Sequence, residues 1–317
     1  MAPRLDVKRA LGTWRRAARE WVQDKCPRLA AALAYYTAFA LAPLLLLVIA
    51  VAGMLWDSAA VRAAVVGQAT SLVGPASAAT IDEVLGHAQR ARSGWLGATV
   101  AVAGFVIGAT GVFGELQGAL NTIWGVDVRK GGWRHALKTR VLSFSLIVVV
   151  GFLLLVSLVV SAAWHAVAAR LRTMLDGTFL VALGTAVDLA VSLGLFTVLL
   201  AAIYKVLPDV RVQWRDTWVG AFATALLLAL GKTLIGLYLG HSRVASAFGA
   251  AGSLAVILAW LYYTGLVLFL GAEYTQVRAE AAGRPLEPKP HAYAIQAVQR
   301  DEVAPARKGR RKPHTKA

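Results

Sequence analysis

The stretch LAAALAYYTAFALAPLLLLVIAVAGML, residues 29–55, carries no charged side chain from end to end. Because an α-helix rises ~1.5 Å per residue, about 20 apolar residues are enough to cross a hydrocarbon core ~30 Å thick. Further apolar runs of about this length follow at about 95–114, 141–163, 180–204, 217–239 and 248–270. The sequence therefore predicts an all-α, polytopic membrane protein built as a bundle of six transmembrane helices.

Composition and charge agree with a membrane location. Of the 317 residues, 58% are hydrophobic and 16% are charged, whereas soluble domains carry nearer a quarter charged residues. The net charge of +16 is uneven, because sixteen lysines and arginines flank one side of the predicted spans and six flank the other. Loops rich in lysine and arginine stay in the cytoplasm, so we expect both termini there, next to the anionic membrane lipids of the inner leaflet. The orientation of the spans explains the basic charge, and no specific nucleic-acid partner is predicted.

Three regions are expected along the chain. Residues 1–28 include an amphipathic helix with Trp14 and Trp21 on its apolar face, which either lies on anionic lipid or packs on the cytoplasmic end of the bundle. Residues 29–275 form the membrane domain, whose first external loop, 57–94, is expected to hold short helices broken at Gly74-Pro75. Residues 276–317 are basic and contain several prolines, so we expect a disordered cytoplasmic tail.

Lys232 stands inside the apolar stretch TALLLALGKTLIGLYLG, residues 224–240. Its Gly-Lys-Thr triplet is not a nucleotide-binding loop, because Leu226 occupies a position where that loop requires glycine. Asp188 in the preceding span is expected at a matching depth, ~10–12 Å below the outer interface. Three interpretations stay open: Lys232 reaches out to the headgroups, the two residues form a clamp between helices, or both line a polar pathway for substrate or protons.

Polar residues are also expected where two spans end at the cytoplasmic side. The second apolar run continues as one helix to about residue 124, so it protrudes from the membrane or bends along its surface. Glu115 and Asn121 lie near the end of that helix, and Glu273 lies at the same side, at the end of the last span. The two glutamates are either ordinary interfacial carboxylates in contact with water, or they join Asn121 at an inner mouth that binds a cation or a polar substrate.

The first and last spans contain further unusual residues. Pro43 is expected to interrupt the first helix, because it frees a backbone carbonyl near mid-membrane. Tyr262 and Tyr263 fall in the middle of the last span, where phenolic hydroxyls need partners, so both are expected to face the bundle interior. Three pairs of glycines spaced by four favour close helix packing: Gly104 with Gly108, Gly114 with Gly118, and Gly236 with Gly240.

The sequence shows no recognisable catalytic or metal-binding pattern. The six histidines are scattered without metal-ligand spacing, and Cys26 is the single cysteine. Neither a Gly-x-Ser-x-Gly motif nor a zincin helix nor a close carboxylate pair is found. We therefore expect neither an enzyme nor a cofactor.

Four stretches together resemble the YihY/BrkB family of bacterial inner-membrane proteins: LAAALAYYTAFALAPLLLL, GALNTIW, VLPDVRVQWRDTWVGA and FGAAGSLAVILAWLYYTGLVLFLGAEYTQ. They keep the family's order and spacing over about residues 20–280, with departures at Ala40, where serine is usual, and Phe248, where tyrosine is usual. The resemblance implies six spans, cytoplasmic termini and an integral inner-membrane protein. It also brings the label ribonuclease BN, which is considered a misassignment, and the cytoplasmic loops here offer mostly cations rather than acidic metal ligands.

These features favour a transporter or flippase-like protein for a lipid or a small envelope solute. The expected pathway residues are Asp188, Lys232, Glu115, Asn121, Glu273, Tyr262 and Tyr263. The alternative from another class is a structural or assembly partner of envelope proteins, using the glycine faces and the basic tail, and the chain is also compatible with a homo-oligomer. A ribonuclease is the least favoured function.

Overall fold

The computed structural model describes residues 7–52, 62–63, 66–67, 82, 86, 95–128, 177–241, 250–284 and 287–295. Its helices are α1 (Val7–Gln23), α2 (Cys26–Ala52), α5 (Trp95–Ile123), α7 (Gly177–Val206), α8 (Trp214–His241) and α10 (Ala250–Ala281). Its strands are β1 (Val126–Val128), β2 (Val210–Arg211), β3 (Glu287–Pro288) and β4 (Ala292–Ala294). The predicted span 141–163 and most of loop 57–94, with its predicted short helices, lie outside the described residues.

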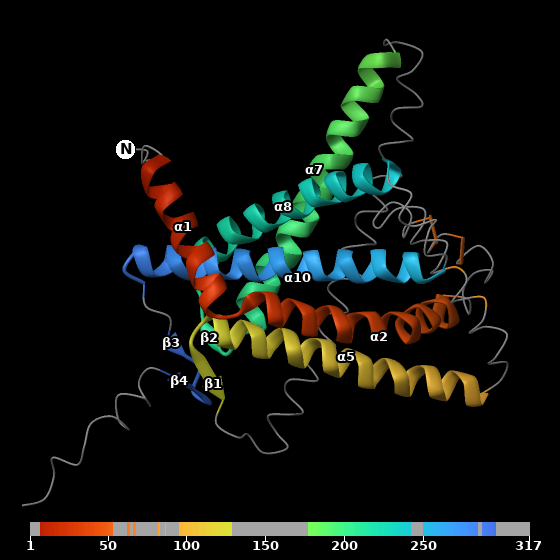
Figure 1. The fold of residues 1–317 in the computed structure, drawn as a ribbon, viewed down its shortest axis with the longest axis horizontal. Helices are drawn as coiled ribbons and strands as arrows, with labels where there is room; N and C mark the ends of the chain where they lie inside the picture. The colour runs from red at the N-terminus through yellow and green to blue at the C-terminus, as the bar shows by residue number, and fades with distance from the viewer. Residues whose placement is uncertain are drawn as a thin grey trace, which may run out of the picture.

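Helix α10 is the centre of the bundle (Figure 1). It packs against α1, α2, α5 and α8, while α2 also packs against α5 and α7 against α8. Two small antiparallel sheets lie together beside the end of α5, where β1 pairs with β4 and β2 pairs with β3. We call the end of the bundle that carries these sheets and α1 the strand end.

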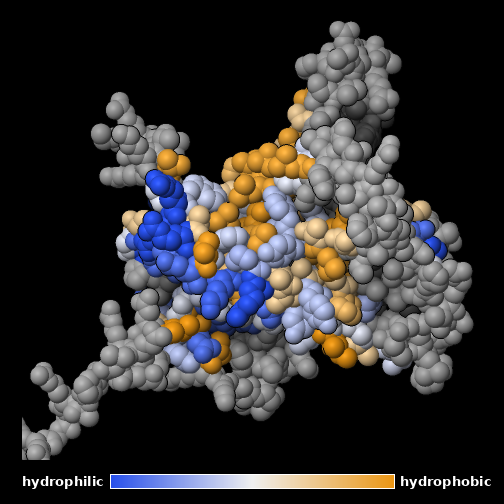
Figure 2. All heavy atoms as spheres, viewed as in Figure 1, coloured by the Kyte–Doolittle hydropathy of each residue, from blue (hydrophilic) through white to orange (hydrophobic). Residues whose placement is uncertain are grey.

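The predicted apolar runs coincide with helices wherever the structure describes them. The run at 29–55 lies largely in α2, and the run at 95–114 continues in one helix to Ile123, as expected. Among the described residues, the stretches long and apolar enough to cross a membrane are 189–206 of α7, 214–234 of α8 and 255–281 of α10. The total of six spans stays a prediction. On the face shown in Figure 2, apolar side chains cover much of the middle of the bundle, and strongly hydrophilic ones gather nearer the strand end.

Helices α8 and α10 cross at two matching pairs of glycine and threonine. A Cβ atom at Gly220 would lie 1.8 Å from Thr275 Oγ1, and one at Gly271 would lie 1.7 Å from Thr224 Oγ1. Each threonine hydroxyl donates to the carbonyl of the glycine four residues earlier in its own helix, at 2.8 Å. The hydroxyl of Tyr204, from α7, lies 3.0 Å from Thr224 Oγ1. Because these glycines carry no side chain, three helices approach closely at this point.

The contact between α2 and α5 also depends on glycine. A Cβ atom at Gly104 would lie 3.4 Å from the ring of Pro43, and one at Gly108 would lie 2.9 Å from Ala40 Cβ, so this predicted packing pair is confirmed. The predicted interruption at Pro43 is wrong, because α2 continues through it to Ala52. A membrane helix can absorb a proline when its neighbours compensate, and here the proline ring rests in the space left by Gly104.

Helix α1 packs on the strand end of α10. The rings of Trp14 and Tyr274 stack with their centroids 4.2 Å apart, and Trp21 Nε1 donates to Leu266 O at 3.2 Å. Two apolar side chains of α1, Leu11 and Val22, remain exposed, at 61% and 63%. Of the two interpretations of this amphipathic helix, packing on the end of the bundle is the one that the structure shows.

The residues after the last predicted span are ordered well beyond position 276. Helix α10 continues to Ala281, and β3 and β4 then return to pair with β2 and β1. The expectation of a disordered tail is therefore wrong for residues 276–284 and 287–295. Composition misleads here because the strands are stabilised by backbone pairing with segments distant in sequence, which leaves no local signal.

Candidate functional site

The strand end is shaped by two short connections that leave the helices. Helix α5 ends at Ile123 and turns at Gly125, whose φ of 60° lies in the left-handed region that glycine adopts without strain, and β1 follows at once. Helix α7 ends at Val206, and Asp209 lies just before β2. The chain after α10 contacts both connections, because Ile295 N donates to Gly125 O at 2.9 Å and Lys289 N donates to Asp209 O at 2.9 Å.

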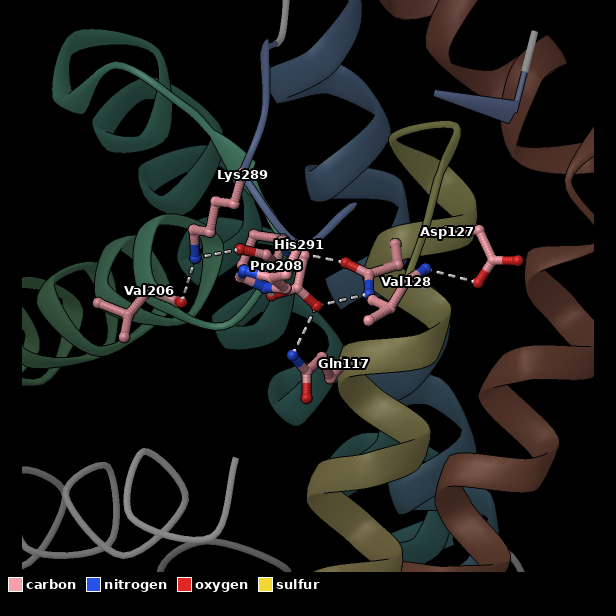
Figure 3. A network of polar contacts seen from close by, with 9 residues as sticks. Gln117, Asp127, Val128, Val206, Pro208, Lys289 and His291 are labelled. Carbon is pink, nitrogen blue, oxygen red and sulfur yellow. Dashed lines mark hydrogen bonds and ion pairs between the residues drawn. The ribbon is translucent and has the colours of Figure 1, made fainter. Parts of the chain in front are cut away.

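A network of polar contacts, to which Gln117, Pro208, Lys289 and His291 belong, lies at this end (Figure 3), and Asp209 makes most of its hydrogen bonds. Its Oδ2 accepts hydrogen bonds from Gln117 Nε2 at 2.8 Å and from Asn121 Nδ2 at 3.0 Å, and its backbone N–H donates to Asn121 Oδ1 at 2.9 Å. Its Oδ1 lies 2.7 Å from His291 Nε2. Lys289 completes the network, because its Nζ donates to Pro208 O at 2.6 Å and its backbone N–H donates to Asp209 O at 2.9 Å.

The network keeps Asp209 ionised although the residue is only 4% exposed. Burial by itself would raise the pKa of Asp209, but the hydrogen bonds to Asn121 and His291 and the positive charges of His291 and Lys289 outweigh it, so the pKa is lowered. A carboxylate held by side chains from α5 and from the segment after α10 fastens three distant parts of the chain together.

A polar pocket of about 520 Å³ opens beside this network. Its hydrophilic lining consists of Glu115, Gln117, Asn121, Thr122, Asp127 and Asp209, and its apolar lining includes Leu29 and Ile295. Gly114 and Gly118 also line the pocket, and a Cβ atom at either would meet nothing within 4 Å. The predicted packing role of this glycine pair is therefore wrong, since the two glycines leave space for the pocket instead.

The pocket brings together only part of the residues predicted from sequence. Glu115 and Asn121 line it, as expected of an inner mouth. Glu273 is not among its lining residues: it is fully buried in α10, where its Oε1 accepts a hydrogen bond from Cys26 Sγ at 3.6 Å. The interpretation of Glu273 as a water-exposed interfacial carboxylate is therefore wrong, because α1 and α2 cover it.

The remaining predicted residues lie within the helices, away from the strand end. Tyr263 faces inward as expected, with its hydroxyl donating to Leu227 O at 2.7 Å. Tyr262 is 36% exposed, so its predicted inward orientation is wrong. Lys232 is exposed on α8, and the side chain of Asp188 in α7 lies outside the described part of the structure, so their pairing stays a prediction.

Sequence reasoning missed Asp209, Gln117 and His291 as members of one site. Asp209 does fall in the stretch VLPDVRVQWRDTWVGA, which carries part of the family resemblance, and that was the available signal. In the described part of the chain, no group of three histidines, cysteines or acidic residues is placed to hold a metal ion. The site can therefore be described as a polar pocket with carboxylate and carboxamide groups, suited to hydrogen-bonding or cationic groups of a ligand.

Long apolar helices around a central helix, with polar groups gathered in a pocket at one end, define a helical membrane protein. The model of the family described as virulence factor BrkB matches residues 17–296, so the chain belongs to the BrkB family, as the resemblance in the sequence indicated. No solved structure matches the chain.

Curated relatives of the chain are membrane proteins. A UPF0761 membrane protein of Tolumonas auensis is 33% identical over 168 residues, which cover 51% of each chain. The UPF0761 membrane protein YihY of Escherichia coli is 28% identical over 188 residues, covering 57% of this chain and 59% of its own length. A relative in Delftia acidovorans is 29% identical over 182 residues, 55% of this chain and 40% of its own. The chain thus spans about half the length of these relatives.

Proposed function

We propose that this protein moves a lipid or a small amphiphilic envelope solute across the bacterial inner membrane. The pocket at the strand end carries the proposal, because it is a polar cavity at the end of an otherwise apolar bundle and is lined by Glu115 and Asn121. A polar headgroup entering there would exchange water for carboxylate and carboxamide partners. The apolar helices beside the pocket would accommodate an acyl chain in contact with lipid.

The proposed orientation places the strand end in the cytoplasm. Sixteen lysines and arginines flank the predicted spans on the side of the termini, against six on the other side, and positive residues are retained on the cytoplasmic side. The pocket would then receive its solute from the cytoplasmic leaflet or from the cytoplasm, and Lys232 and Asp188 would lie toward the opposite side.

One observation, the exposed apolar residues of α8, supports an alternative role in the assembly of envelope proteins. Along α8, residues spaced by four form an apolar, exposed row that winds around the helix: Trp214, Trp218, Phe222, Leu226, Leu230 and Leu234. Such a row fits lipid, but it also fits a helix of another envelope protein or of a second copy of the chain. Neither an enzyme nor a ribonuclease belongs to the proposal.

Reconstitution in vesicles tests the transport function. The purified protein is placed in vesicles of phosphatidylethanolamine and phosphatidylglycerol, and the loss of a fluorescent lipid from the outer leaflet and the uptake of small solutes are measured. Gly118→Leu is the informative variant, because Gly118 lines the pocket and a Cβ atom there would meet nothing within 4 Å. Gly194→Leu is the matched control, since a Cβ atom at Gly194 in α7 also meets nothing within 4 Å.

The expected result is transport by the wild-type protein, a severalfold loss in Gly118→Leu and no loss in Gly194→Leu. Equal transport by all three proteins would remove the pocket from the pathway. If the folded wild-type protein moves none of the probes, the result favours the assembly role. Crosslinking from the exposed row of α8 would then test that role.

A further inference from the structure

Glu273 is a carboxyl group that the pocket does not use. It is fully buried within α10, and its Oε2 has no hydrogen-bond partner among the described residues. Its other oxygen accepts only the weak hydrogen bond from Cys26 Sγ, at 3.6 Å. An ionised carboxylate in such a position would be costly, because several kcal/mol are lost when an unpaired charge leaves water.

The acidic side chains that act on Glu273 come from α1 and from the turn that follows it. Glu20 of α1 and Asp24 of the turn that follows it both interact with Glu273. Arg16 of α1 is already paired with Glu20 at 2.7 Å and with Glu280 at 2.5 Å. Arg19 and Lys25, which are the cations adjacent to Glu20 and Asp24 in the chain, are exposed.

The other helices also offer no counter-ion. From α2 the neighbour is the thiol of Cys26, while Arg28 is exposed. The carboxylate of α8 nearest to α10 is Asp216, which is paired with Arg284 at 2.5 Å. Glu115, which is the only charged residue of α5, lines the pocket. Among the described residues, no cation forms an ion pair with Glu273, so a proton is the available counter-charge.

Asp24 connects the buried carboxyl to water. Its side chain is half-buried at the turn between α1 and α2, where it interacts with Glu273. Burial and then the charge of Glu20 raise the pKa of Asp24, although the interaction with Glu273 acts in the opposite direction. Two neighbouring carboxyl groups of this kind share a proton more readily than they both ionise.

We infer that Asp24 and Glu273 form a proton-binding site, in which Glu273 carries the proton and Asp24 exchanges it with water. In the exchange, the O–H bond on Asp24 breaks as an O–H bond forms on the carboxylate of Glu273, and Asp24 is then protonated again from hydronium. A link to the pocket exists in α2, where Cys26 contacts Glu273 and Leu29, one turn later, lines the pocket. A role in proton-coupled transport rests on the proposed function, whereas proton binding itself does not.

Removal of the proton would weaken the docking of α1. An ionised Glu273 would face Glu20 and Asp24 across the contact that Trp21 and Leu266 hold together. Like charges at this distance repel strongly in a medium of low dielectric constant. Protonation would therefore fasten α1 and the start of α2 to α10, and deprotonation would loosen them beside the pocket.

Infrared difference spectroscopy tests the proton site on the full chain in lipid nanodiscs. Between neutral and alkaline pH, the wild-type protein should lose the carbonyl stretch of a protonated carboxylic acid, and Glu273→Gln should lack this signal. Glu280→Gln is the matched control on the same helix, since Glu280 is exposed and paired with Arg16, and it should keep the signal. Asp24→Asn should move the midpoint of the signal to lower pH, because it removes a negative neighbour.

The inference is overturned if the wild-type protein shows no such band, or if the band persists in Glu273→Gln. If Glu273→Gln fails to fold, Asp24→Asn still tests the inference. An unchanged pH midpoint of the infrared signal in Asp24→Asn would contradict a proton site formed by Asp24 and Glu273. A second assay imposes a pH gradient on the vesicles used for transport. Acceleration in the wild type but not in Glu273→Gln supports coupling, and equal acceleration refutes it. Failure of all transport would refute the proposed function while the infrared result still decides the proton site.

Discussion

The closest contact in the bundle makes Gly271→Ala the sharpest test of the fold. The new Cβ atom would lie 1.7 Å from Thr224 Oγ1 and 2.7 Å from the hydroxyl of Tyr204, so α8 and α10 must separate or the threonine must turn away. Overpacking of this kind costs about 1–3 kcal/mol. Turning Thr224 away also breaks its hydrogen bond to Gly220 O, worth about 1 kcal/mol. Alanine returns about 1 kcal/mol through helix propensity, which leaves a net loss of about 1–3 kcal/mol.

The free energy of unfolding is measured by titrating the protein in mixed micelles with sodium dodecyl sulfate. Gly194→Ala is the control, because a Cβ atom there meets nothing within 4 Å, and it should unfold like the wild type or slightly later. The double variant Gly271→Ala with Thr224→Ala should lose less stability than the sum of the two single variants, because the clash and the lost hydroxyl involve the same atoms. Equal stability of Gly271→Ala and Gly194→Ala would refute the close approach of α8 and α10.

Three further predictions concern polar groups. Tyr263→Phe should lose about 1 kcal/mol of unfolding free energy in the same titration, because it removes the hydrogen bond to Leu227 O, whereas Tyr262→Phe should lose nothing. Asp216→Asn should lower the free energy of unfolding by about 1–3 kcal/mol, because Arg278 and Arg284 lose their buried carboxylate partner but remain partly exposed to water. The control is Asp127→Asn, a substitution of an exposed aspartate. Because the pKa of Asp209 is lowered in the fold, its contribution to stability is present above the ordinary aspartate pKa and disappears as the pH falls through the lowered value. The backbone amides of residues 287–295 should therefore lose their protection from hydrogen exchange in strong acid. In His291→Ala this loss of protection should occur at higher pH, and loss at the same pH in both proteins would contradict the network.

The helices could be predicted from sequence because a membrane span is a local property. Length and apolarity of one segment decide it, and α5 accordingly begins at Trp95 and runs to Ile123 as expected. Side-chain direction is less local. Tyr262 and Tyr263 were both placed inward, yet successive residues of an α-helix point about 100° apart, so only one of the two could be directed at the groove beside Gly231.

The site was predictable in part for the same reason. Glu115 and Asn121 follow an apolar run on one helix, so their place at its end could be inferred. Asp209 contacts Asn121, 88 residues away in the sequence, and His291, 82 residues away. No local sequence pattern around any of these residues indicates the contacts. The strands that bring them together have two or three residues each, too short to show an alternating pattern. Glu273 was placed at the mouth because its sequence position does not reveal that α1 folds back over it.

Charge balance at the strand end unites these observations. The buried ionised or ionisable acidic residues described there are Asp209, Asp216 and Glu273. His291 Nε2 lies 2.7 Å from Asp209 Oδ1, the charge of Lys289 also acts on Asp209, and Asp216 is paired with Arg284 and Arg278. The basic residues after the last predicted span therefore have specific partners in addition to their effect on topology. Glu273 alone among these three is left without a cation, although α1 beside it carries several. Arg16 of α1 pairs with Glu20 and Glu280 instead. The fold thus gives basic partners to two buried carboxylates, Asp209 and Asp216, and none to Glu273. A proton, which can bind and dissociate, is therefore the counter-charge available to Glu273.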